Sequence, residues 1–279
     1  MKEAIHFFEP IKIGERRNIP LLKETLSNAG NVIYRTNDGY DVYISNDGLP
    51  YNGIKCNRPV EVTFLNDLHT QKVSLSNLQK GELKNYFVPN KYNGYTGCPS
   101  GTYPSDLYDR WNNILRRLYS GKIGDPKWIK YKDTLLDERW RSFDNFAKWY
   151  LYNISLLNQE LGINYEVDKD IIANVFNQPS MYGPDTCLLI PCKLNSIIGS
   201  IKGNSEFPGV IKNKKRFTTT LTIDGIKRYF GTYDTPEEAY EIYKRVKKDR
   251  IMEVTNYFHS IGALTDFAYE MLERYEVKY

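Results

Sequence analysis

Histidine and cysteine are scarce in this sequence, and it has no long apolar run. Three histidines among 279 residues leave few candidates for a catalytic base that titrates near neutral pH. The four cysteines are Cys56, Cys98, Cys187 and Cys192. Their spacing fits neither a zinc pair nor a disulfide framework. Because the N-terminus also lacks a signal-peptide pattern and no stretch could span a membrane, we expect a soluble intracellular protein without a membrane partner.

The remaining composition is that of an ordinary globular protein. At 279 residues the chain is long enough for two or three small domains. The 23 tyrosines are unusually many. They suit a nucleic-acid-binding protein that stacks aromatic rings on bases, and an RNA-directed function is one interpretation, although packing in a core is the commoner use of tyrosine.

The segment from Gly209 to Tyr257 predicts a short antiparallel sheet backed by one helix. Its first strand alternates, with Thr218, Thr220 and Thr222 on one face and Phe217, Thr219, Leu221 and Ile223 on the other. Asp224-Gly225 is a strong hairpin signal, and residues 226–233 are typical of the returning strand.

A helix start follows the hairpin. Thr235 suits the N-cap, Pro236 the first helical position and Glu238 the third, which together form a capping box. The apolar stripe that could then lie on the sheet consists of Ala239, Ile242, Tyr243 and Val246.

Positive charge is concentrated in this segment. Between Lys202 and Arg250 there are twelve basic and seven acidic residues, a surplus of five, whereas the whole chain carries only +4. The basic residues at the sheet are Lys212, Lys214, Lys215, Arg216, Lys227 and Arg228. A solvated charged surface would explain them, but a sheet face of hydroxyls flanked by cations also suits DNA phosphates and a groove edge.

The same segment contains a characteristic set of residues: Gly209-Val210, Phe217, the run Tyr229-Phe230-Gly231-Thr232-Tyr233-Asp234-Thr235, Glu237-Glu238-Ala239 and Tyr243. At these positions it resembles the Apetala/ethylene-response-factor type of DNA-binding domain. The resemblance implies a sheet that docks in the major groove, with Thr218, Thr220, Thr222, Lys227 and Tyr229 facing DNA. Pro208 and Ile211 replace arginines of the plant domains, so the plant sequence preference does not carry over.

The rest of the chain divides into further predicted parts. Residues 1–30 remain unassigned, residues 31–88 predict a small β module with strand-like runs such as Val60 to Phe64, and residues 89–105 predict a linker. Residues 106–201 predict a helical and ββα-metal-like unit, residues 202–258 the DNA-binding domain, and residues 259–279 one further helix. That helix has a stripe of Leu264, Phe267, Ala268 and Met271 and is expected to cap the C-terminal domain rather than form a dimer contact.

Acids, amides and a lysine gather between Tyr165 and Asn195. Asp168 and Asp170 bracket Lys169 after an apolar lead, and Asn177 and a second apolar run follow. An exposed hairpin with acidic ends would explain this pattern. The alternative is a nuclease site at which a carboxylate and an amide oxygen hold Mg²⁺, with positions left for a phosphate and water.

A series of motifs follows in a fixed order along the chain: Trp111 to Tyr119, Trp140, Phe143, Phe146 and Trp149, Val167 to Ile171, Asn177, Tyr182 to Cys187, Ile190-Pro191 and Leu194-Asn195. Over residues 31–257 this order resembles that of phage-encoded proteins of the His-Asn-His (ββα-metal) homing endonuclease group. The resemblance implies Asp168 and Asn195 as ligands of Mg²⁺ or Mn²⁺, Lys169 in the position of the base beside Asp170, and Asn177 as the residue that fixes the loop.

No histidine lies in that central segment. A lysine near its normal pKa is protonated at pH 7 and makes a poor base, so Lys169 could instead stabilise charge on the phosphate while metal-bound hydroxide attacks. We therefore predict an α+β multidomain, metal-dependent DNA endonuclease that acts on double-stranded DNA in the cytoplasm of a bacterial host cell. The alternative is a DNA-binding regulator or architectural protein without activity. The sequence leaves the choice between monomer and dimer open.

Overall fold

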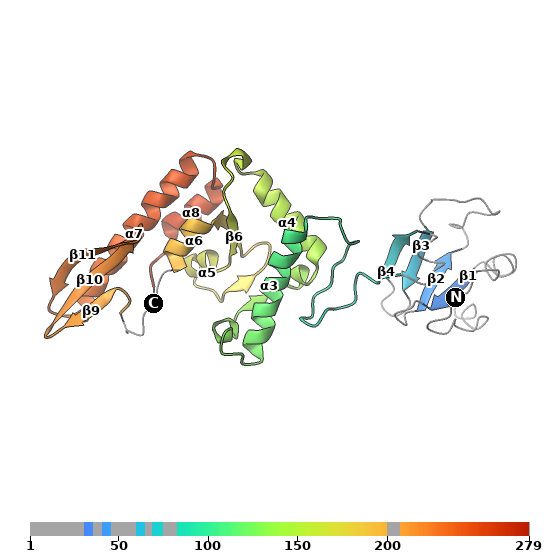
Figure 1. Cartoon of the computed structure of the whole chain (residues 1–279), viewed down its shortest axis with the longest axis horizontal. Coiled ribbons are helices and arrows are strands. Elements are labelled where there is room, and N and C mark those ends of the chain that lie inside the picture. The colour runs from blue at the N-terminus through green and yellow to red at the C-terminus, as the bar shows by residue number, and fades with distance from the viewer. Residues whose placement is uncertain are drawn as a thin grey trace. The chain divides into compact units, whose positions relative to one another are not determined.

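The computed structural model describes residues 31–35, 41–45, 60–64, 69–74, 83–199 and 207–278. The chain forms two compact units (Figure 1). Residues 1–89 with 95–99 make the first unit, and residues 90–94 with 100–279 make the second. The predicted N-terminal segment 1–30 and the start of the predicted DNA-binding domain at 202–206 lie outside the described residues.

The first unit contains a four-stranded antiparallel sheet in the order β1-β2-β3-β4. Its strands are β1 (Asn31–Arg35), β2 (Asp41–Ser45), β3 (Val60–Phe64) and β4 (His69–Val73). The strand expected at Val60 to Phe64 is thus present. Val62 and Phe64 are fully buried, whereas Thr63 between them hydrogen-bonds the Thr70 hydroxyl at 2.8 Å, because successive side chains of a strand point to opposite faces.

Two helices built on aromatic residues open the second unit. The elements are α3 (Ser105–Lys122), η3 (Ile129–Tyr131), β5 (Leu135–Leu136), η4 (Glu138–Arg141), α4 (Phe143–Ser155) and η5 (Gln159–Leu161). Trp111 of α3 is buried against Phe143 of α4 and donates its indole N–H to the Trp140 carbonyl at 2.8 Å. Trp111, Trp140, Phe143 and Phe146 are therefore core residues.

A ββα arrangement follows. The elements are β6 (Tyr165–Asp168), α5 (Asp170–Val175), β7 (Met181–Tyr182), β8 (Leu188–Pro191) and α6 (Cys192–Gly199). Strands β6 and β8 are antiparallel, with Asp168 opposite Leu188, and α6 begins directly after β8. Strand β7 pairs in parallel with β5 and so connects this part to the helical part.

The C-terminal part is a three-stranded antiparallel sheet in the order β11-β10-β9, packed on helix α7. Its elements are β9 (Val210–Asn213), β10 (Arg216–Ile223), β11 (Ile226–Tyr233) and α7 (Pro236–Ser260). The hairpin at Asp224-Gly225 and the capping box of Thr235 and Glu238 are both confirmed. Thr219 faces the helix, where its buried hydroxyl donates to the Ala239 carbonyl at 2.6 Å.

One hydrophobic core joins the ββα elements to the C-terminal sheet. Ile190 of β8, Leu194 of α6 and Ile251 of α7 are fully buried in it, together with Met271 of α8 (Asp266–Arg274). Helix α7 continues past the sheet to pack against α8 (Figure 1). The prediction that Phe267 belongs to the apolar stripe of α8 is wrong, because its side chain is 52% exposed. The buried face of α8 contains Met271 and Leu272 instead.

Candidate functional site

The outer face of the C-terminal sheet, away from α7, carries hydroxyls and cations. Residues directly opposite each other in an antiparallel pair share a face. Thr218 lies opposite Thr232, Thr220 opposite Tyr229 and Thr222 opposite Lys227. Because Thr219 points into the helix, these neighbouring residues point outward. The outer face therefore consists of Ile211, Asn213, Arg216, Thr218, Thr220, Thr222, Lys227, Tyr229 and Thr232.

Hydrogen bonds order part of this outer face. The Thr232 hydroxyl contacts the Tyr229 hydroxyl at 2.9 Å and the Thr218 hydroxyl at 3.3 Å. Arg216 pairs with Asp234 at 2.9 Å. The Tyr229 side chain remains 64% exposed. The face thus presents an aromatic ring, hydroxyl groups and cations on a rigid strand scaffold.

The predicted DNA-contacting residues occupy three different places. Arg216, Thr218, Thr220, Thr222, Lys227 and Tyr229 lie on the outer face. Lys214 and Lys215 are exposed in the turn between β9 and β10, where Lys214 has a φ of 53°. Lys212 lies opposite Phe217 and Arg228 opposite Leu221, so strand pairing places both on the α7 side of the sheet.

Asp168 lies at the end of β6, where its buried carboxylate caps helix α5. The carboxylate oxygen Oδ1 accepts the backbone N–H groups of Asp170 at 2.9 Å and Ile171 at 2.8 Å. Burial raises the pKa of Asp168 to about 6, and the nearby Asp170 carboxylate adds to the rise. The two backbone N–H groups and Lys169 act in the opposite direction, because they favour the charged form.

Lys169 and Asp170 line a pocket of about 440 Å³ beside η3. The Lys169 ammonium donates to Asp170 at 2.5 Å and lies 5.5 Å from the Tyr131 ring and 5.7 Å from the Tyr182 ring. Asp170 also accepts the Ser180 hydroxyl at 2.6 Å. The candidate base is thus held in an ion pair, with an aromatic ring on two sides.

The two candidate asparagines lie elsewhere in the unit. Asn195, on α6, donates its side-chain amide to the carboxylate of Glu166 on β6. Asn177 is exposed just after α5, with a φ of 49° and its N–H directed to the Asn174 carbonyl at 3.3 Å. No group of three or more His, Cys, Asp or Glu side chains that could hold a metal ion occurs among the described residues. Binding of Mg²⁺ or Mn²⁺ stays a prediction.

Sequence reasoning missed two residues of interest. Lys247 is fully buried on α7, although lysine is normally an exposed residue. The available signal was its spacing, four residues after Tyr243 and four before Ile251, on the stripe that packs into the core. The available signal for Glu166 was its position in β6, two residues before Asp168.

No family model, curated protein or solved structure matches this chain. Among the residues that the structure describes, no helix has both the length and the apolar character needed to cross a membrane.

Proposed function

We propose that this protein binds double-stranded DNA through the outer face of the β9-β10-β11 sheet. The observation that carries the proposal is the segregation of side chains across the sheet. Phe217, Thr219 and Leu221 are directed to α7, while Arg216, Lys227 and Tyr229 stand on the opposite, open face.

The chemistry of this outer face matches a duplex groove. Arginine and lysine side chains neutralise phosphates, and hydroxyl groups hydrogen-bond both phosphates and base edges. β-strands are among the elements that enter DNA grooves. The face is dominated by threonines and cations, with Tyr229 as its exposed aromatic ring, and this composition favours a duplex over stacking on successive single-stranded bases.

A binding assay tests this proposal. Fluorescence anisotropy would compare a mixed-sequence DNA duplex with its separate strands for the wild type and for the variant R216A/K227A/Y229A. The matched control is K212A/R228A, which removes two cations from the α7 side of the same sheet. We expect the first variant to lose duplex affinity at least tenfold more than the control. Equal losses in both variants would contradict the assignment to the outer face.

Metal-dependent cleavage of DNA is a second candidate function. It is favoured by the order of antiparallel β6 and β8 followed by α6, with Asp168 and Lys169 at the end of β6. The side chains present do not form the ligand pair that the resemblance implies, because Asp168 caps α5 and Asn195 is engaged by Glu166.

Cleavage has its own test. Mixed phage and host genomic DNA would be incubated with the protein in Mg²⁺ or Mn²⁺, beside Asp168→Ala. Discrete products that disappear in the variant would support cleavage at this site, and products that persist would place the active site elsewhere. Tight, salt-sensitive binding without products under either metal would leave a DNA-binding regulator or architectural protein.

A further inference from the structure

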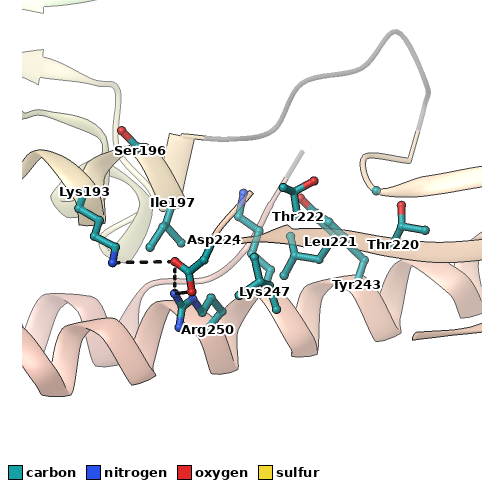
Figure 2. A pocket seen from close by; sticks show the side chains of 12 residues that line it. Lys193, Ser196, Ile197, Thr220, Leu221, Thr222, Asp224, Tyr243, Lys247 and Arg250 are labelled. Carbon is teal, nitrogen blue, oxygen red and sulfur yellow. Dashed lines mark hydrogen bonds and ion pairs between the residues drawn. The ribbon is translucent and has the colours of Figure 1, made fainter. Parts of the chain in front are cut away.

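A second pocket, of about 610 Å³, lies between α6, the end of β10 and α7 (Figure 2). Its walls include Lys193 and Ile197 from α6, Thr222 from β10, and Lys247 and Arg250 from α7. This pocket is separate from the pocket of Lys169 and Asp170, because the two pockets share no lining residue. Three basic side chains and one acidic side chain, that of Asp224, line it.

The most unusual of these residues is Lys247, which has no exposed surface. Its ammonium nitrogen Nζ makes no hydrogen bond in the part of the chain that the structure describes, and the Tyr243 ring at 5.8 Å is its aromatic neighbour. Figure 2 shows the side chain reaching from α7 into the space between Ile197 and Thr222. An ammonium that is removed from water without a partner is costly, so a site of this kind calls for an anion.

The acidic residue of the pocket is already engaged. The Asp224 carboxylate accepts the Arg250 guanidinium at 2.7 and 2.8 Å and lies 3.8 Å from the Lys193 ammonium. Dashed lines in Figure 2 mark these contacts, and Lys247 takes no part in them. Two cations therefore share this carboxylate, and Lys247 has no hydrogen-bonding partner among the residues that the structure describes.

The open edge of β10 adds a backbone donor. The Thr220 N–H donates to the Gly209 carbonyl at 2.9 Å, on the side of β10 where β9 lies. Thr222 lies two residues beyond Thr220, so its N–H points to the same side of β10. The pairing with β9 ends at Thr219 and Val210, and no described strand therefore lies opposite Thr222. Thr222 lines the pocket, which thus combines an ammonium group with a backbone N–H that no described strand pairs.

We propose that this pocket binds a phosphate group, with Lys247 as its charge partner and Thr222 as a hydrogen-bond donor. A phosphate offers several acceptor oxygens and a negative charge, which complement these donors. The group could belong to a small phosphate compound or to the backbone of a DNA duplex. Thr220 and Thr222 contribute to both the pocket and the outer face, so a bound duplex could reach both. Only this second source rests on the proposed DNA binding.

Titration calorimetry with inorganic phosphate, in a phosphate-free buffer of constant ionic strength, tests the proposal. The variants are Lys247→Met, which keeps the length of the side chain, and Lys148→Ala on α4 as the surface control, which lies outside the pocket and the outer face. We expect phosphate binding by the wild type, a loss of at least tenfold in K247M and no change in K148A. Melting curves verify that K247M folds. Lys193→Ala, at the exposed rim, provides a second variant and should weaken phosphate binding severalfold.

Duplex DNA in a second arm distinguishes the two sources. If K247M loses phosphate binding and keeps its DNA affinity, the ligand is a small phosphate compound. If K247M loses DNA affinity, whether or not the wild type binds inorganic phosphate, the ligand is a backbone phosphate. The proposal is overturned if the wild type does not bind phosphate and K247M binds DNA as the wild type does. Failure of K227A to weaken DNA binding would instead count against the outer-face proposal.

Discussion

Asn195 on α6 donates its side-chain amide to the carboxylate of Glu166 on β6. The contact joins residues 29 positions apart and links helix α6 to strand β6. Asp168, two residues further along β6, is used differently, as the cap of α5. The asparagine that the sequence indicates as a distal metal ligand therefore has a structural partner of its own.

The Glu166–Asn195 contact should contribute measurably to stability. Hydrogen bonds to charged groups contribute about 1.5 to 3 kcal/mol, and partial exposure of this pair lowers the expectation to about 1 kcal/mol for Asn195→Ala. Urea unfolding of N195A, E166A and the double variant gives the coupling energy. Strictly additive losses in the double variant would show that the contact contributes nothing beyond its separate residues.

Lys227 and Arg228 are adjacent on β11, yet they stand on opposite sides of the sheet. If the outer face binds phosphates, Lys227→Ala should weaken duplex binding by about 1 kcal/mol and reduce the slope of log affinity against log salt by about 1. Arg228→Ala should leave that slope unchanged. Duplex affinities measured at four or more salt concentrations would give the slope for each variant. A larger decrease of the slope in R228A than in K227A would contradict the placement of Lys227 on the DNA-binding face.

The buried charge of Lys247 should make stability depend on pH. Burial lowers the pKa of Lys247 from 10.5 to about 8 in the folded protein, so the folded state releases this proton earlier than the unfolded state does. The cost of the buried charge is therefore fully present below pH 8 and is relieved as the pH rises from 8 to 10.5.

In phosphate-free buffer at pH 7, the free energy of unfolding of Lys247→Met should therefore be about 2 kcal/mol higher than that of the wild type. This difference should decrease as the pH approaches 10. Lys227→Ala, at an exposed position, serves as the control and should show no such trend. Chemical denaturation across the pH series provides the measurement. A K247M advantage that stays constant over this range would contradict the lowered pKa.

Gly209 and Gly225 should respond differently to alanine, although both have positive φ angles, of 75° and 80°. A Cβ atom at Gly209 would lie 2.0 Å from the buried Tyr243 ring, whereas nothing lies within 4 Å of one at Gly225. Gly225→Ala should cost only the backbone strain, about 1 kcal/mol. Gly209→Ala adds a steric clash and should cost about 3 kcal/mol in urea unfolding. Similar losses at both positions would contradict this account of Gly209.

The C-terminal hairpin, the capping box and the alternation of Thr218, Thr219 and Thr220 could be predicted from the sequence, because they depend on residues close together in the chain. A two-residue turn fixes which strands pair, and the Thr235 cap satisfies N–H groups within one helical turn. The buried faces of α3 and α4 also follow a local pattern, since Trp111, Phe143 and Phe146 stand at helical spacing from their apolar neighbours and a helix must bury its apolar stripe.

The contacts between distant charged and polar residues could not be predicted in this way, because they depend on the packing of the folded chain. Strand register, including the irregularity between Thr218 and Thr220, placed Arg228 on the α7 side of the sheet. The packing of α6 brought Asn195 to Glu166, and the shared core enclosed Lys247. These outcomes depend on how distant elements pack, and nearby sequence cannot specify a contact between residues that only folding brings together.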